Sequence, residues 1–248
     1  MKTILGIDVG ASGIKGALVD VETGELVSER IKIPTPQPST TQAVAGAIND
    51  LVELSNYDGD LIGCGFPSII KNGVALSAAN IDQSWIGTDV EKLLAVATGK
   101  EVVAVNDADA AGLSEMRFGK GKGVKGSVML ITIGSGLGSA LFTDGHLVRN
   151  TELGHLHLRS GEVAEHYVSN TSRKKFEMSW EEFGKRFNEY LRHIERLFTP
   201  DLVILGGGVS NDFEQFSPFL DVRIPVTTAM MFNHAGIIGA ALYAHESK

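Results

Sequence analysis

Apolar runs of strand length alternate along this chain with segments whose apolar residues recur at helical spacing. The strand-like runs break off at glycine or at a polar turn, and they occupy residues 3–10, 61–70, 101–106, 127–134 and 201–208. Helical spacing is found in residues 41–56, 178–198 and 234–246. Strands that alternate with helices in this way predict an α/β fold.

Two stretches of the chain repeat the same order of features. Residues 4–20 read ILGIDVGASGIKGALVD, and residues 129–145 read MLITIGSGLGSALFTDG. Each is a strand, a glycine turn, a second strand and an aspartate-containing turn. Such a duplication predicts two similar domains that face a cleft. We expect a small first domain over 1–105, a large second domain over 106–233, and a C-terminal helix at 234–248 that packs back on the first.

Composition narrows the possible classes of protein. Hydrophobic residues make up 43% of the 248 positions, enough for a full core, and the single cysteine, Cys64, excludes a disulfide framework or a multi-cysteine zinc site. The net charge of −8 argues against general nucleic-acid binding. No apolar run approaches the roughly 20 residues that span a bilayer, and we expect no targeting segment before Thr3. A cytoplasmic protein without nucleic-acid or membrane partners is therefore expected.

Three glycine-rich turns follow apolar strands, and glycine allows a backbone to approach phosphate oxygens closely. The candidate phosphate contacts are Gly10, Ala11, Ser12, Gly13, Lys15, Thr132, Gly134, Ser135, Gly136, Gly206, Gly207 and Gly208. One such turn alone is usually a hairpin, but three in one chain favour phosphate binding. None fits the P-loop or the dinucleotide signature. Asp8, at the end of the first strand, suits Mg²⁺ binding through water molecules, with an Asx turn as the alternative.

Taken together, these turns resemble those of the ROK (repressor, open reading frame, kinase) sugar kinases in the actin-like ATPase superfamily, which has a ribonuclease H-like fold. DVGASGIKG resembles the first phosphate loop of that family, TIGSGLGSAL the second, and LGGGVS the turn on the nucleotide side. The resemblance covers nearly the whole chain. The pattern NDADAAGLSEMRFGKGKG and the ending NHAGIIGAAL look most like the polyphosphate glucokinases within the family, some of which also accept ATP.

The resemblance implies a sugar site. Asp107 matches the general base that takes the proton from the reacting hydroxyl, and Asn106 matches an amide that holds a sugar hydroxyl. A hexose hydroxyl needs such a base to become a good nucleophile. On chemistry alone Asp109 competes for this role, and a helix N-cap is the structural alternative for Asp107. The other positions that match sugar contacts are Gly65, Asn80, Glu152, His155 and Glu165.

The segment after His155 departs from the family pattern. Many relatives carry a cysteine-rich zinc motif there, whereas this chain has no cysteine in that segment. His155 and His157 cannot by themselves complete a four-ligand site. We therefore expect no zinc, with His155 serving the sugar and with His157 and His166 as hydrogen-bonded core residues.

The resemblance implies phosphorylation of glucose to glucose 6-phosphate with Mg²⁺, with inorganic polyphosphate as the donor and ATP as an alternative donor. Candidate basic residues for the donor groove are Lys15, Lys120, Lys122, Lys125, Arg173, Lys174 and Lys175. Two other readings stay open: a strictly ATP-dependent hexokinase for glucose, mannose or fructose, and a non-catalytic sugar-sensing ROK protein. The repressors of the family carry an N-terminal helix-turn-helix domain, which we do not expect here because Thr3 begins the first phosphate strand. Relatives are commonly dimers, so a homodimer is expected.

Overall fold

The computed structural model describes residues 2–248, which divide into two compact units. Unit 1 extends to Ser114 and resumes over His234–Lys248, and unit 2 comprises Glu115–Asn233. The chain was expected to pass from the first domain to the second near residue 105. It does so later, inside helix α3 (Asp107–Phe118). The reason is packing, because a Cβ on Gly239 of the C-terminal helix would overlap the carbonyl oxygen of Ala110. The first turns of α3 therefore belong to unit 1.

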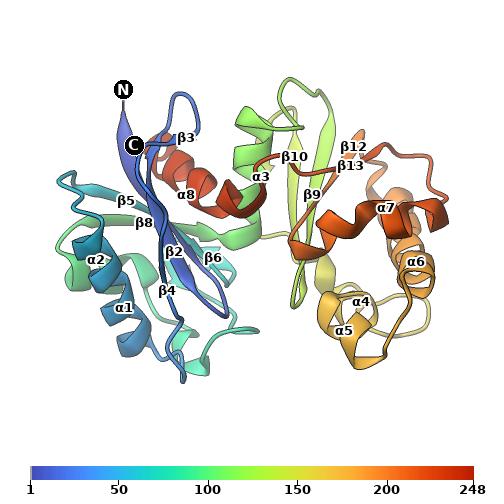
Figure 1. The fold of residues 1–248 in the computed structure, drawn as a ribbon, viewed down its shortest axis with the longest axis horizontal. Helices are drawn as coiled ribbons and strands as arrows, with labels where there is room; N and C mark the ends of the chain where they lie inside the picture. Colours follow the sequence, from blue (N-terminus) through green and yellow to red (C-terminus); the bar gives the residue numbers. More distant parts are fainter. Residues whose placement is uncertain (1) are drawn as a thin grey trace. The chain divides into compact units, whose positions relative to one another are not determined.

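The sheet of unit 1 has the strand order β3-β2-β1-β5-β8, with β4 paired to β2 (Figure 1). Its strands are β1 (Thr3–Val9), β2 (Ile14–Asp20), β3 (Glu25–Leu26), β4 (Ile31–Ile33), β5 (Leu61–Phe66) and β8 (Glu101–Asn106). β1 runs antiparallel to β2 and parallel to β5, and β5 runs parallel to β8. The remaining elements of unit 1 are α1 (Thr41–Leu54), the hairpin β6 (Ile70–Lys71) and β7 (Val74–Ala75), η1 (Gln83–Trp85), α2 (Val90–Thr98) and α8 (Ala235–Glu246).

Helices cover both faces of this sheet because side chains alternate along β1. Leu5 and Ile7 point into a hydrophobic core that they share with Leu51 of α1. Gly6, between them, faces α8, and a Cβ there would overlap the carbonyl oxygen of Ile237. The bulky face of β1 thus meets α1, and its glycine face lets the backbone of α8 lie directly on the strand.

The sheet of unit 2 repeats the central arrangement of the first. Its order is β11-β10-β9-β12-β13, with β9 antiparallel to β10 and parallel to β12. The strands are β9 (Ser127–Ile133), β10 (Leu137–Thr143), β11 (His146–Val148), β12 (Leu202–Gly206) and β13 (Val226–Thr228). The duplication predicted from the sequence is therefore confirmed at the level of strand pairing.

Most of the helices in unit 2 are short, and one long helix covers its core. They are η2 (Leu153–His155), α4 (Ala164–Tyr167), α5 (Asn170–Lys175), α6 (Trp180–Phe198), η3 (Gly208–Asp212), α7 (Phe213–Phe216) and η4 (Ser217–Phe219), and η5 (Phe232–His234) leads back to unit 1. The Ser179 hydroxyl caps α6 by accepting a hydrogen bond from the backbone N–H of Glu182. Its inner face is aromatic, and the fully buried Phe183 and Phe187 pack edge-on against Phe216.

Across residues 2–248, none of the helices combines the length and the apolar character that crossing a membrane requires.

Candidate active site

Three predicted site positions in unit 1 lie at the carboxyl ends of adjacent parallel strands. In the strand register Asp8 of β1 is opposite Gly65 of β5, and the next residue of β5, Phe66, is opposite Asn106 of β8. Ligand sites of open α/β sheets are typically found at this edge. Gly65 lies beside Asp107, since a Cβ there would be in ordinary contact with the Asp107 Cα, at 3.8 Å.

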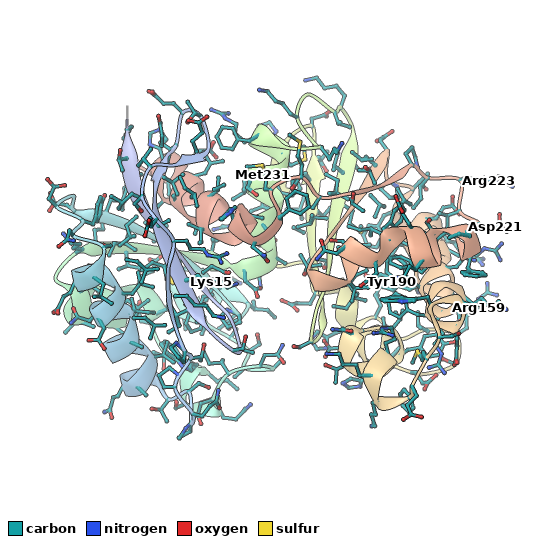
Figure 2. All side chains as sticks on the ribbon, viewed as in Figure 1. Lys15, Arg159, Tyr190, Asp221, Arg223 and Met231 are labelled. Atoms are coloured by element: carbon teal, nitrogen blue, oxygen red, sulfur yellow. The ribbon has the colours of Figure 1, made fainter. Side chains whose placement is uncertain are left out.

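Asp8 is paired with a cation from the neighbouring strand. Lys15 lies opposite it on β2, and the Lys15 Nζ is 3.2 Å from the Asp8 Oδ2 (Figure 2 labels Lys15). The first turn of α8 also approaches Asp8, because a Cβ on Gly236 would lie 2.9 Å from the Asp8 Cγ. The positive end of that helix dipole favours the carboxylate.

The first glycine turn is a closed loop with an exposed tip. The backbone N–H of Gly10 donates to the carbonyl of Gly13 at 3.1 Å, and the Thr35 hydroxyl donates to the carbonyl of Gly10 at 2.5 Å. Ala11 and Ser12 lie at the tip and are exposed. Hydrogen bonds to Gly13 and Thr35 thus fix the loop at Gly10, while its tip is exposed to solvent.

Asn106 directly precedes helix α3 and caps it, and the Asp107 Oδ1 also accepts a hydrogen bond from the backbone N–H of Ala108, at 2.8 Å. The Asn106 side-chain oxygen accepts hydrogen bonds from the backbone N–H groups of Ala108 and Asp109, at 2.9 and 3.1 Å. Its Nδ2 donates to the carbonyl of Ser68 at 3.2 Å. An amide nitrogen carries two hydrogens, so the Asn106 Nδ2 can donate a second hydrogen bond.

Asp107 and Asp109, the two candidates for the general base, differ in burial. Asp109 is only 1% exposed, whereas Asp107, the first residue of α3, is partly exposed. A general base must reach its substrate, and of the two carboxylates Asp107 is the more accessible. Asn80, the remaining sugar candidate in unit 1, is exposed in a bend outside the strands.

In unit 2 the other two glycine turns lie side by side. Gly206 at the end of β12 is opposite Thr132 of β9. Gly207 has a φ of 76°, and a Cβ there would lie 2.5 Å from the carbonyl oxygen of Ile133. No bulkier residue fits that contact, so glycine at position 207 allows the two turns to touch.

The second turn is closed in the same way as the first. The backbone N–H of Gly134 donates to the carbonyl of Gly136 at 3.0 Å, and the exposed Ser135 lies between them. The carbonyl of Gly134 in turn accepts from the backbone N–H of Asn170, the first residue of α5. Gly208 begins η3, with open space where a Cβ would be.

The three sugar candidates of unit 2 form one cluster around His155. The His155 Nε2 is 3.8 Å from a carboxylate oxygen of Glu152, and its Nδ1 is 3.9 Å from one of Glu165. Burial raises the pKa of Glu152, and so does the neighbouring Glu165, against the opposing effect of His155. Two carboxylates and an imidazole can accept and donate several hydrogen bonds to a sugar.

Strand β10 holds the segment that carries Glu152 and His155 in place. The Ser139 hydroxyl donates to the carbonyl of Thr151 and accepts from the backbone N–H of Leu153 at 2.9 Å. A Cβ on Gly154 would overlap the carbonyl oxygen of Leu137, so the turn that carries Glu152 and His155 lies directly on the strand.

Two other histidines were placed wrongly by sequence reasoning. His157 and His166 were expected in the core, but both are exposed. The His157 Nδ1 lies 3.1 Å from the carbonyl oxygen of Gly161, and the His166 Nε2 is 3.7 Å from Glu165. Over residues 2–248, no group of three or more histidine, cysteine or acidic side chains is arranged to hold a metal ion.

Sequence reasoning also missed a cationic pocket on α6. The sequence pointed instead to the loop lysines Lys120, Lys122 and Lys125, which are exposed, and to Arg173, whose guanidinium stacks 4.1 Å from the Trp180 ring centroid. The missed pocket includes Arg192 and Arg196. The signal available in the sequence was their spacing, which puts basic residues on one face of the long helix.

The chain belongs to the ROK family, whose sequence model matches residues 4–172. Its fold is the actin-like ATPase fold of the ROK sugar kinases, with an α/β organisation in both units. Polyphosphate glucokinase of Mycobacterium tuberculosis (strain CDC 1551 / Oshkosh) is 44% identical over 238 residues, covering 96% of this chain and 89% of its own. The same enzyme of Mycobacterium leprae (strain TN) is 42% identical, over 96% and 73% of the two chains.

Solved structures agree with this placement. The inorganic polyphosphate/ATP-glucomannokinase of Arthrobacter sp. strain KM superposes with a TM-score of 0.96 at 45% identity, over the full length of both chains. A ROK family glucokinase from Streptomyces griseus, solved with glucose and AMPPNP, has a TM-score of 0.85 at 24% identity. It covers 99% of this chain and 100% of its own, and at that identity it supports the fold alone.

Proposed function

We propose that this protein transfers a phosphoryl group from inorganic polyphosphate to glucose and releases glucose 6-phosphate. The observation that carries the proposal is the position of Asp107, partly exposed beside Gly65, the β5 residue that lies opposite Asp8 at the carboxyl edge of the same sheet. The 44% identity to polyphosphate glucokinases supports the choice of donor and acceptor. The protein is accordingly a polyphosphate–glucose phosphotransferase.

Each unit contributes its own part of the chemistry. Asp107 accepts the proton of the sugar hydroxyl as that hydroxyl attacks the terminal phosphorus. Asn106 is held by its bonds to Ser68 and to the start of α3, so its free amide hydrogen is pre-positioned. In unit 2, Glu152, His155 and Glu165 bind sugar hydroxyls.

The glycine turns hold the donor. The exposed tips at Ala11–Ser12 and at Ser135 offer backbone N–H groups to phosphate oxygens, and Gly206–Gly208 supply a third such surface. Lys15, now paired with Asp8, is long enough to turn to a phosphate when a donor binds.

Asp8 fits a water-mediated role toward Mg²⁺. It is a single carboxylate at a strand end, and Mg²⁺ keeps most of its water molecules when it binds to proteins. The ion would neutralise negative charge on the phosphoryl group in transfer.

ATP and mannose are additional substrates in this proposal. The Arthrobacter enzyme, 45% identical over its full length, is by name an inorganic polyphosphate/ATP-glucomannokinase. The non-catalytic alternative is disfavoured, because a sensor would need neither Asp107 nor the phosphate turns. We also propose a homodimer, which light scattering of the purified protein would test.

The test replaces Asp107 by Asn and measures glucose 6-phosphate formation with polyphosphate and with ATP. Because Asn cannot accept the proton, turnover is expected to fall about 10²–10⁴-fold while glucose affinity by calorimetry stays near the original value. Asp50→Asn on the exposed side of α1 is the matched control and should leave turnover unchanged. Full turnover by the Asp107→Asn protein would exclude Asp107 as the base, and absence of turnover by the unaltered protein with any hexose would refute the function.

A further inference from the structure

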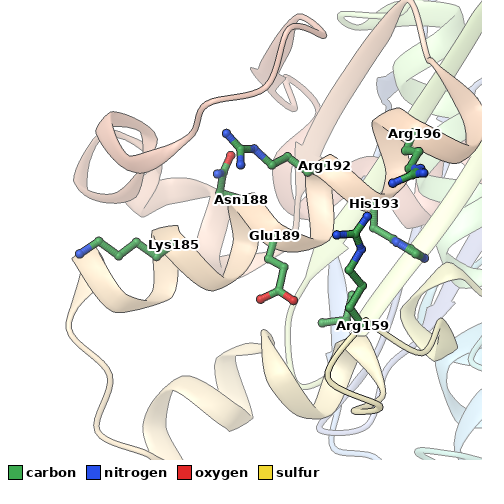
Figure 3. A pocket seen from close by; sticks show the side chains of 8 residues that line it. Arg159, Lys185, Asn188, Glu189, Arg192, His193 and Arg196 are labelled. Carbon is green, nitrogen blue, oxygen red and sulfur yellow. The ribbon is translucent and has the colours of Figure 1, made fainter.

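Helix α6 borders a pocket of about 540 Å³ that belongs entirely to unit 2 and contains none of the glycine-turn residues. The pocket is lined by Leu158, Arg159, Lys185, Asn188, Glu189, Arg192, His193 and Arg196. Figure 3 shows Lys185 at one end and Arg159, His193 and Arg196 at the other. It is therefore an elongated site with charged side chains along its length.

The charge of this pocket is opposite to that of the whole protein. Four of the eight lining residues are arginine or lysine and one is acidic, whereas the whole chain carries a net charge of −8. The one carboxylate, Glu189, already accepts a hydrogen bond from the Tyr167 hydroxyl at 3.0 Å. An anion entering the pocket would thus meet mostly cations.

These cations are available for a ligand. Lys185 pairs with Glu181 at 2.6 Å, and Arg192 pairs with Asp221, which is largely exposed. Such exposed pairs contribute only about 0–1 kcal/mol, so a phosphate can compete for the cations. Neither Arg159 nor Arg196 makes an ion pair with any of the residues 2–248.

The part of the backbone that carries Lys185, Arg192 and Arg196 is fixed by packing. The opposite face of α6 is locked into the core by fully buried side chains, Tyr190 among them (Figure 2). Lys185, Arg192 and Arg196 lie at helical spacing on the outer face. Arginine presents a planar fork of donors that matches phosphate oxygens.

From these observations we propose that the α6 pocket is a second binding site for the inorganic polyphosphate chain, separate from the glycine turns that hold its reacting end. The inference rests on the proposed use of polyphosphate as donor. A long chain held at two places gains affinity through effective concentration, so the site would confer a preference for long donors over short ones. Nucleic acid is the less suitable polyanion, because the net charge of −8 repels a large phosphate backbone outside the pocket.

The test uses the double variant R159Q/R196Q in the full chain, with K71Q/K92Q in unit 1 as the control that removes the same charge from exposed lysines. Calorimetry measures binding of long-chain polyphosphate, tripolyphosphate and single-stranded DNA at two salt concentrations. We expect R159Q/R196Q to weaken long-chain binding about tenfold and to reduce its salt dependence by about one unit for each lost contact. Tripolyphosphate is too short to be held at both places and should lose less affinity than the long chain. ATP-driven turnover should not change, and R159K/R196K should recover part of the long-chain affinity.

Unchanged long-chain binding in R159Q/R196Q would overturn the proposal. An equal loss of ATP-driven turnover would also overturn it, because the arginines would then serve folding or the reacting end. Binding of DNA more tightly than polyphosphate would reassign the pocket to nucleic acid. If the unaltered protein binds long-chain polyphosphate but does not use it to phosphorylate glucose, the proposed function fails while the binding comparison still decides the fate of the pocket.

Discussion

Glu115 joins the two ends of unit 2. It is the first residue of that unit, its side chain is fully buried, and one carboxylate oxygen accepts hydrogen bonds from the backbone N–H groups of Met230 and Met231, at 2.7 and 2.6 Å. The other oxygen accepts from the backbone N–H of Lys120 at 3.0 Å. Figure 2 labels Met231, which lies shortly before the chain leaves unit 2. The side chain of Glu115 therefore links the segment where the chain enters unit 2 to the segment where it leaves.

The cost of removing this side chain can be worked from its three bonds. A hydrogen bond to a charged group contributes about 1.5–3 kcal/mol, but two of the donors share one oxygen and all three sites are only partly buried. For Glu115→Ala we expect a loss of about 3–5 kcal/mol in the free energy of unfolding, because three backbone N–H groups lose their acceptor and each unsatisfied buried donor costs about 1–3 kcal/mol. Glu115→Gln keeps one oxygen for the two methionine N–H groups but turns an amide donor toward the Lys120 N–H. Its cost should be about 1–2 kcal/mol.

Urea unfolding followed by circular dichroism measures both values, with thermal unfolding as a second probe. Glu181→Gln is the control, because that residue makes only an exposed pair with Lys185 and should change stability by less than about 0.5 kcal/mol. A loss of under about 1 kcal/mol in Glu115→Ala would refute the view that this carboxylate fastens the unit.

Two further predictions concern the site residues. Glu152→Gln should weaken glucose binding. At pH values above neutral, the same variant should have a higher melting temperature than the unaltered protein. The raised pKa means that the folded state takes up a proton more readily than the unfolded one, so ionisation of Glu152 lowers stability as pH rises through its folded pKa. The gain should disappear in melting curves at low pH, and a gain independent of pH would contradict this reasoning. Gly207→Ala should lower the free energy of unfolding in urea by roughly 1–3 kcal/mol, because residue 207 has a φ of 76° and lies against the Ile133 carbonyl. Gly208→Ala, which has open space around it, should lower it by less than about 0.5 kcal/mol. Equal losses in the two variants would be evidence against the close contact.

The arrangement of strands could be predicted because the sequence pattern carries it directly. Apolar runs that end at glycine appear twice in the same order, and the two sheets pair their central strands in the same way. Asp8 and Asn106 could be placed at one edge of a sheet because both follow apolar strands. The role proposed for Asp107 comes from the resemblance to the ROK family, because chemistry alone left it open against Asp109.

What could not be predicted depends on contacts between segments that are distant in the sequence. Nothing local to Glu115 indicates that its carboxylate binds the backbone of Met230 and Met231. Similarly, Arg159 comes to α6 from a separate loop, and only the fold makes it part of one pocket with Arg196. The histidine positions failed for a related reason, since the exposure of His157 and His166 depends on how the irregular segment between η2 and α5 folds.

The direct packing of α8 on the sheet of unit 1 has a consequence for synthesis on the ribosome. The backbone of α8 packs directly against Gly6 and Gly63. The ribosome produces α8 only after all of unit 2 has been made. At typical elongation rates that interval is on the order of ten seconds. During it, the nascent unit 1 carries an uncovered groove of strand backbone, while unit 2, being continuous, can already fold. The emerging polypeptide should therefore be most susceptible to chaperone binding and aggregation in its first half, until the last helix closes that groove.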